Sequence, residues 1–318
     1  MSGKVSIRWT TDAQLSAIQA ARVVATGSVC ADRKTEQALA TPITEINNRL
    51  LSASLDIGQF WQSLVNESVF DFGEQRACEI ALMHSGCSEL QLEQIANVIV
   101  NRLGESRMAF QGRFPKLVEQ LDLRGRPIRE HWDTVGPGLL GSIAKQIWAN
   151  SPPADWWPTK VNGVLVQPMR GGDGGIDVES CKFWIEALLT NVDPQVPEVL
   201  RVAWLVTQLA IEIHTQERSS ENSGSIPWAI GTVPLVLTAA KDLEILRGDE
   251  LPIESAMQLW GLGDHNVAKI VSQWWQQQQK SPTPMPVGLK QLDQMLIPSR
   301  QPKTGLSEQE IDLSQLDF

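Results

Sequence analysis

The sequence predicts a mainly α-helical fold, a bundle-like assembly of many helices with one small β-hairpin at about residues 161–179. Three observations favour this class. Residues 193–214 are apolar on nearly every face of a helix, helical patterns fill residues 35–107, and a single β-branched run precedes a glycine-rich turn. A helix that is apolar all round is buried by its neighbours. We therefore expect 193–214 to be the core helix of the protein.

The first elements are a short β-like run at Val5–Trp9 and a helix from Asp12, which Thr11 or Asp12 could cap. Four amphipathic segments follow, with breaks so short that antiparallel neighbours in a bundle are expected. Ser88 with Gln91 matches a capping box at the start of the last of them. The predicted helices are 35–53, 56–68, 73–85 and 88–103.

Glycine and proline divide the middle of the chain. A helix is predicted over 106–121, and the Gly-Pro-Gly run at 136–138 is expected to begin a separate helix of about 138–149. The run SPPADWWP at 151–158 has the composition of a loop. It is the predicted boundary between an N-terminal half, 1–150, and a C-terminal half, 159–280.

The C-terminal half begins with the predicted hairpin, in which 161–169 and 176–178 are joined by the turn RGGDGG. A short helix over 180–189 should follow, and then the core helix. Residues 281–318 are expected to be a proline-rich linker and a mobile tail. Further helices are predicted at 229–246, 253–260 and 266–279.

The amino-acid composition argues against some classes of function. The 318 residues carry 27 Lys and Arg against 37 Asp and Glu, a net charge of −10, which argues against non-specific binding to nucleic acid or an anionic membrane. The 4 cysteines are too scattered for a disulfide framework. No secretory signal or membrane span is evident, so a cytoplasmic protein is expected, with its oligomeric state left open.

The glycine-rich turn is the first candidate site. Such loops can present backbone N–H groups to phosphate, but this one lacks both the GxxxxGK[ST] and the GxGxxG spacing, and Asp173 would repel an anion. A hairpin tip is the favoured interpretation. The alternative is a hard cation held by Asp173 and Asp177.

A local basic cluster on this acidic chain is the second candidate. It comprises Arg124, Arg126, Arg129 and His131, and arginine forks recognise carboxylate or phosphate groups. A solvated segment paired to surplus acids is the simpler interpretation. If a ligand site exists, we expect this cluster to lie beside Arg170, Asp173 and Asp177.

The sequence contains only weak patterns for a metal site or a catalytic nucleophile. Cys78, His84 and Cys87 are zinc-ligand types, but their spacing fits no zinc motif, so no metal and no cofactor is predicted. The GxSxG and HExxH patterns are also missing from the sequence.

The last eight residues, IDLSQLDF, alternate apolar and acidic side chains, which is typical of peptides that dock in another protein's groove. Gln315-Leu316-Asp317-Phe318 resembles a shortened form of the QL[SD]LF peptides that bind bacterial sliding clamps, although it lacks one apolar position of that pattern. The resemblance implies a protein partner bound through Gln315, Leu316 and Phe318. The alternative is a chain end with no partner.

Abundant apolar helix, 12 tryptophans and the lack of a catalytic spacing favour an interaction or scaffold protein, which binds partners through its helical surface or its tail. The alternative is a hydrolase or phosphate-handling enzyme with a site between Arg124–His131 and the 170–177 turn. No pattern extends over enough of the chain to name a family.

Overall fold

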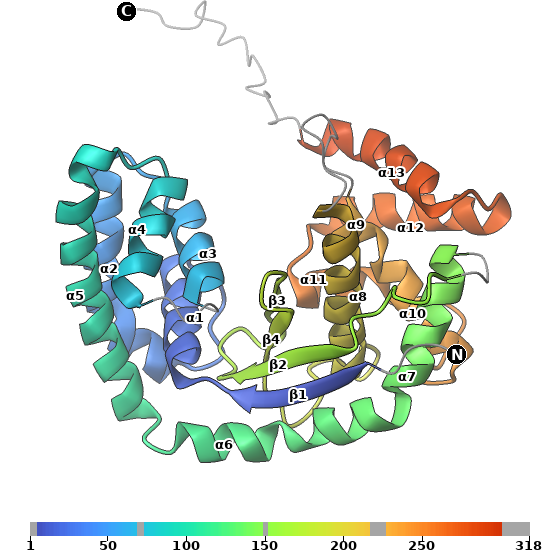
Figure 1. Cartoon of the computed structure of the whole chain (residues 1–318), viewed down its shortest axis with the longest axis horizontal. Helices are drawn as coiled ribbons and strands as arrows, with labels where there is room; N and C mark the ends of the chain where they lie inside the picture. Colours follow the sequence, from blue (N-terminus) through green and yellow to red (C-terminus); the bar gives the residue numbers. More distant parts are fainter. Residues whose placement is uncertain (1–4, 69–72, 149–151, 217–226, 301–318) are drawn as a thin grey trace, which may run out of the picture.

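A computed structural model describes residues 5–68, 73–148, 152–216 and 227–300. The predicted class is confirmed: the fold is mainly α with one small four-stranded sheet. Figure 1 shows one group of helices, α1 to α5, on one side of the sheet and a second group, α8 to α13, on the other. Within the described residues, no helix is long and apolar enough to cross a membrane.

The first group of helices follows the sequence prediction closely. Strand β1 (Ser6–Thr11) leads into α1 (Ala13–Ala25), and the Asp12 carboxylate caps α1 by accepting the Leu15 N–H at 2.8 Å. Ser88 precedes the last helix without the side-chain bond that a capping box requires. The other helices of the group are α2 (Arg33–Ser52), α3 (Ile57–Ser68), α4 (Glu74–His84) and α5 (Glu89–Arg113).

The sheet differs from the predicted hairpin. Its order is β1-β2-β4-β3, with β1, β2 and β4 parallel and only β3 antiparallel. The strands predicted at 161–169 and 176–178 exist as β2 (Lys160–Val166) and β3 (Gly174–Asp177), but they do not pair with each other. The hairpin instead joins β3 to β4 (Lys182–Glu186).

The helix predicted over 180–189 is therefore wrong, because residues 182–186 form β4. Phe183, Trp184 and Ile185 are all buried, as expected for an inner strand covered on both faces. Such a strand is apolar without alternation, so its pattern can be mistaken for a buried helix.

Two further boundaries differ in the middle of the chain. Helix α5 runs to Arg113, and α6 covers Leu117–Arg124. Helix α7 runs unbroken over Arg126–Trp148 with Pro137 inside it, so the predicted start at 138 is wrong. Gly136 has a packing role here, since a Cβ at that position would lie 2.7 Å from the ring of the buried Trp132.

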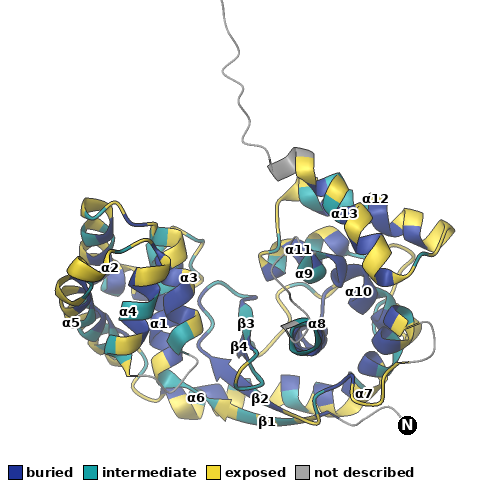
Figure 2. Ribbon diagram, turned by 45° about the horizontal axis from the view of Figure 1, so that its top comes forward, coloured by how far each residue is buried: buried dark blue, intermediate teal, exposed yellow. Residues whose placement is uncertain are grey.

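The core helix is confirmed as α8 (Glu198–Gln216), although it begins five residues after the predicted start at Asp193. Every residue from Val199 to Ile211 is buried, and Figure 2 shows this helix enclosed by its neighbours. It packs against β3, β4, α7 and α10. The helices that follow it are α9 (Trp228–Gly231), α10 (Val233–Asp242), α11 (Ile253–Trp260) and α12 (His265–Lys280).

Residues 285–300, expected in a linker, form a further helix, α13 (Met285–Arg300). Leu289, Leu292 and Leu296 are buried at helical spacing, and the helix packs on α12 and α9. The two predicted halves also share one sheet, because β1 comes from the first half and its partner β2 from the second.

Glycine substitutions in α7 test this packing. We expect Gly136→Ala to lower the free energy of unfolding by about 1–3 kcal/mol, because its Cβ would overlap the buried Trp132 ring. Gly141→Ala is the matched control in the same helix: nothing lies within 4 Å of its Cβ, and it should raise stability by up to about 1 kcal/mol. Urea denaturation measures both, and shifts of the same sign would contradict this account of Gly136.

Candidate functional site

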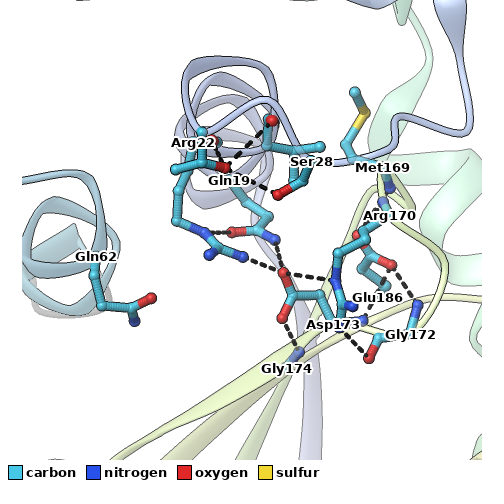
Figure 3. A network of polar contacts seen from close by, with 12 residues as sticks. Gln19, Arg22, Ser28, Gln62, Met169, Arg170, Gly172, Asp173, Gly174 and Glu186 are labelled. Carbon is cyan, nitrogen blue, oxygen red and sulfur yellow. Dashed lines mark hydrogen bonds and ion pairs between the residues drawn. The ribbon is translucent and has the colours of Figure 1, made fainter. Parts of the chain in front are cut away.

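Three parallel strands end at one edge of the sheet, where open parallel sheets commonly bind ligands. Asp12 follows β1, the turn at 167–173 follows β2, and Glu186 is the last residue of β4. Polar side chains from α1, this turn and β4 converge there (Figure 3). We name the residues Gln19, Arg22, Arg170, Asp173 and Glu186 the carboxyl-edge network.

The centre of the network is the fully buried carboxylate of Glu186. Its Oε1 accepts the N–H groups of Met169 and Arg170, both at 2.9 Å. Its Oε2 accepts those of Gly171 at 2.7 Å, Gly172 at 2.8 Å and Asp173 at 3.3 Å. Five consecutive backbone donors therefore surround one charge, the arrangement that binds phosphate in other loops.

The glycines make this turn possible. Gly171 and Gly172 have φ values of 80° and 139°, which other residues rarely adopt. A Cβ on Gly172 would also lie 2.8 Å from the Leu259 carbonyl oxygen. The glycine-rich turn is thus a preformed anion site, and its anion is a side chain of the same protein.

Asp173 joins this turn to α1 (Figure 3). Its Oδ2 accepts a hydrogen bond from Gln19 Nε2 at 2.6 Å and forms an ion pair with Arg22, while Arg22 Nε also donates to Gln19 Oε1 at 2.9 Å. Arg170 Nε lies 3.6 Å from the same oxygen. The aspartate predicted to repel an anion therefore has two cationic partners within the fold.

A second layer joins the turn to the core helix. The guanidinium of Arg201, which is 1% exposed, donates to the Asp173 carbonyl oxygen at 2.8 Å and lies 2.6 Å from Glu198 Oε2. Burial raises the pKa of the Glu198 carboxyl, and the charge of Arg201 opposes that rise. Arg170 extends the layer to the end of α11, where Nη2 donates to the Leu259 carbonyl oxygen at 2.7 Å.

Asp177 lies at the far end of β3 from Asp173. Its carboxylate accepts hydrogen bonds from the Ser180 hydroxyl and, at 3.1 Å, from the Glu179 N–H, so it organises the tight turn before β4. Asp173 and Asp177 thus hold different structural partners instead of facing one another. The described residues contain no group of three or more His, Cys, Asp or Glu side chains that could hold a metal ion.

The basic cluster lies on other elements. Arg124 ends α6, and Arg126, Arg129 and His131 belong to the start of α7. Arg129 pairs with Asp122 at 2.9 Å, and burial lowers the pKa of the His131 imidazole. Among the residues the structure describes, no hydrogen bond or ion pair joins this cluster to the 170–177 turn.

The remaining candidate residues from the sequence also lie outside the carboxyl-edge network. Cys78 is buried and its thiol pKa is raised by that burial, while His84 Nδ1 contacts the Ser63 hydroxyl at 2.7 Å. The tail motif of Gln315, Leu316 and Phe318 lies outside the described residues. Gln19, Arg22 and Glu186 were not predicted from the sequence. Glu186 could have been noticed as the single acidic residue at the end of the apolar run FWIE.

No protein-family model matches the chain, and neither the curated proteins nor the solved structures give a significant match. The geometry of this chain therefore carries any functional proposal.

Charge removal at the centre of the network tests its role. We expect Glu186→Gln to lower the free energy of unfolding by about 2–4 kcal/mol, because a neutral amide accepts five N–H donors poorly and places its own donor among them. Glu179→Gln, an exposed change in the same hairpin, is the control and should be nearly neutral. Equal denaturation midpoints for the two variants would contradict this role.

Proposed function

We propose that the protein is an interaction protein that binds a protein partner through the loop between β4 and α8, residues 187–197. The observation that carries the proposal is a contrast at the carboxyl edge. The charged groups there are used within the fold, whereas Leu189 and Val192 of the adjoining loop are 57% and 51% exposed.

The loop has a fixed shape that suits recognition. Asn191 Oδ1 accepts the Glu198 N–H at 3.0 Å, and Asp193 Oδ1 accepts the Gln195 N–H at 2.8 Å. Val192 also adjoins the glycine-rich turn, since a Cβ on Gly171 would lie 3.6 Å from its Cγ2. A braced loop loses little conformational entropy on binding, and exposed apolar side chains on such a loop favour a protein contact.

The alternative, a hydrolase or phosphate-handling enzyme between Arg124–His131 and the turn, receives less support. The backbone N–H groups that would bind phosphate are bonded to Glu186, and the Asp173 carboxylate is paired with Arg22 and Arg170. These contacts leave the turn few unpaired groups for catalysis.

Site-specific photo-crosslinking tests the proposal. A photoreactive residue at position 189 should capture one partner in cells, whereas the same residue at position 90, where Leu90 is 99% exposed on α5, should not capture it. With the captured protein purified, Leu189→Asp combined with Val192→Asp should weaken binding about tenfold or more, since each aspartate would place an unpaired charge in an apolar contact.

Two controls separate the outcomes. Leu90→Asp should leave the affinity unchanged, and a chain ending at Arg300 tests the predicted tail motif independently. Binding that survives the double aspartate variant but is lost on truncation would overturn the loop proposal and favour the tail.

A further inference from the structure

A cavity of about 390 Å³ lies at the opposite end of α8 from the 187–197 loop. His214, near the end of that helix, lines the cavity, and the helix rises roughly 24 Å between Glu198 and His214. The size is within the range of small-ligand sites, about 300–1,000 Å³. This cavity is independent of the proposed partner surface.

Three tryptophans from three different segments of the chain line the cavity. Trp148 comes from the end of α7, Trp156 from the segment before β2, and Trp228 from the start of α9. The rings of Trp148 and Trp156 meet nearly at right angles, with centroids 5.2 Å apart and planes at 76°. Two of the aromatic residues that line the cavity therefore hold their rings nearly perpendicular to each other.

The remaining contacts fix the Trp156 wall. The His214 imidazole stacks on it with a centroid separation of 5.0 Å and planes 10° apart, and His214 Nε2 lies 3.2 Å from the Trp156 carbonyl oxygen. Trp156 is itself buried. Its ring is therefore held in place before any ligand arrives.

The charge of the lining selects the ligand class. Asp155 is the one Asp, Glu, Lys or Arg side chain among the described residues that line the cavity. Indole faces attract cations through the ring quadrupole, and aromatic walls with a carboxylate bind methylated ammonium groups in many proteins. Among the described lining residues, an anion would meet an acid and no lysine or arginine.

We infer that this cavity binds a methylated ammonium group, with Trp148, Trp156 and Trp228 around the methyl groups and Asp155 opposite the charge. The group could be carried by a free quaternary amine or by a methylated lysine of another protein. Both sources present the same cation to the same walls.

Calorimetric titration of the full chain tests the inference with matched probes. Choline should bind. The neutral analogue 3,3-dimethylbutan-1-ol, in which carbon replaces the nitrogen of choline, should bind with at least about tenfold lower affinity, because it has the shape without the charge. A short peptide with trimethyllysine, compared with the same peptide carrying unmodified lysine, distinguishes the source.

Variants locate the site. Trp148, which is 36% exposed, can be changed to Leu with little effect on the core, and this change should weaken choline binding about tenfold. Asp155→Asn should weaken it several-fold, while Glu179→Gln, which removes an exposed charge elsewhere, should not.

Three results would overturn the inference. These are equal affinity for the neutral alcohol, no binding of either methylated probe at millimolar concentration, or unchanged binding by Trp148→Leu. None of them bears on the 187–197 loop, so the two proposals can fail separately.

Discussion

The architecture depends on one buried charge. The Glu186 carboxylate has no contact with water, and an unpaired ion in that position would be strongly unfavourable. Five backbone N–H groups offset the loss of hydration, which is possible only if the chain after β2 folds back over the end of β4. The shape of the glycine-rich turn is thus a consequence of satisfying Glu186.

That turn then connects the two groups of helices. The Asp173 carboxylate reaches Gln19 and Arg22 on α1, and the Asp173 carbonyl oxygen accepts from Arg201 on α8. A buried ion pair adds little net stability compared with well-packed apolar groups, but loss of one partner is costly. We interpret these contacts as fixing the relative position of α1, the sheet and α8. Parallel sheets commonly bind ligands at this edge. In this protein the polar groups at the edge hold the two groups of helices against the sheet.

Local pattern predicted the helices well and the sheet poorly, for physical reasons. The apolar faces of α1 to α5 and α8 repeat within one segment, so periodicity alone identifies them. The pairing of β1 with β2, and the position of β4 between β2 and β3, depend on contacts outside any one local segment. The signal for α13 was present in Leu289, Leu292 and Leu296, but the prolines of the run SPTPMP at 281–286 suggested a linker.

The residues of the candidate site were also predicted only where the signal was local in sequence. The sequence identified Arg170 and Asp173 through the unusual glycine content of their turn. It could not identify Glu186 as their partner, because the contact exists only when β4 lies beside β2. It also could not separate the basic cluster from that turn, since the rest of α7 and strand β2 lie between them in sequence and local patterns do not give the directions of these elements in space.

The tryptophans of this protein differ in how completely the fold covers their rings. Trp61 and Trp274 are fully buried, as core residues should be. Trp148 leaves about a third of its surface in water, beside two other indoles and a carboxylate. Folding gains most when a large aromatic side chain is covered, because burial of apolar area is favourable. In the ligand site that we infer, a bound methylated ammonium group would remove the uncovered part of Trp148 from water.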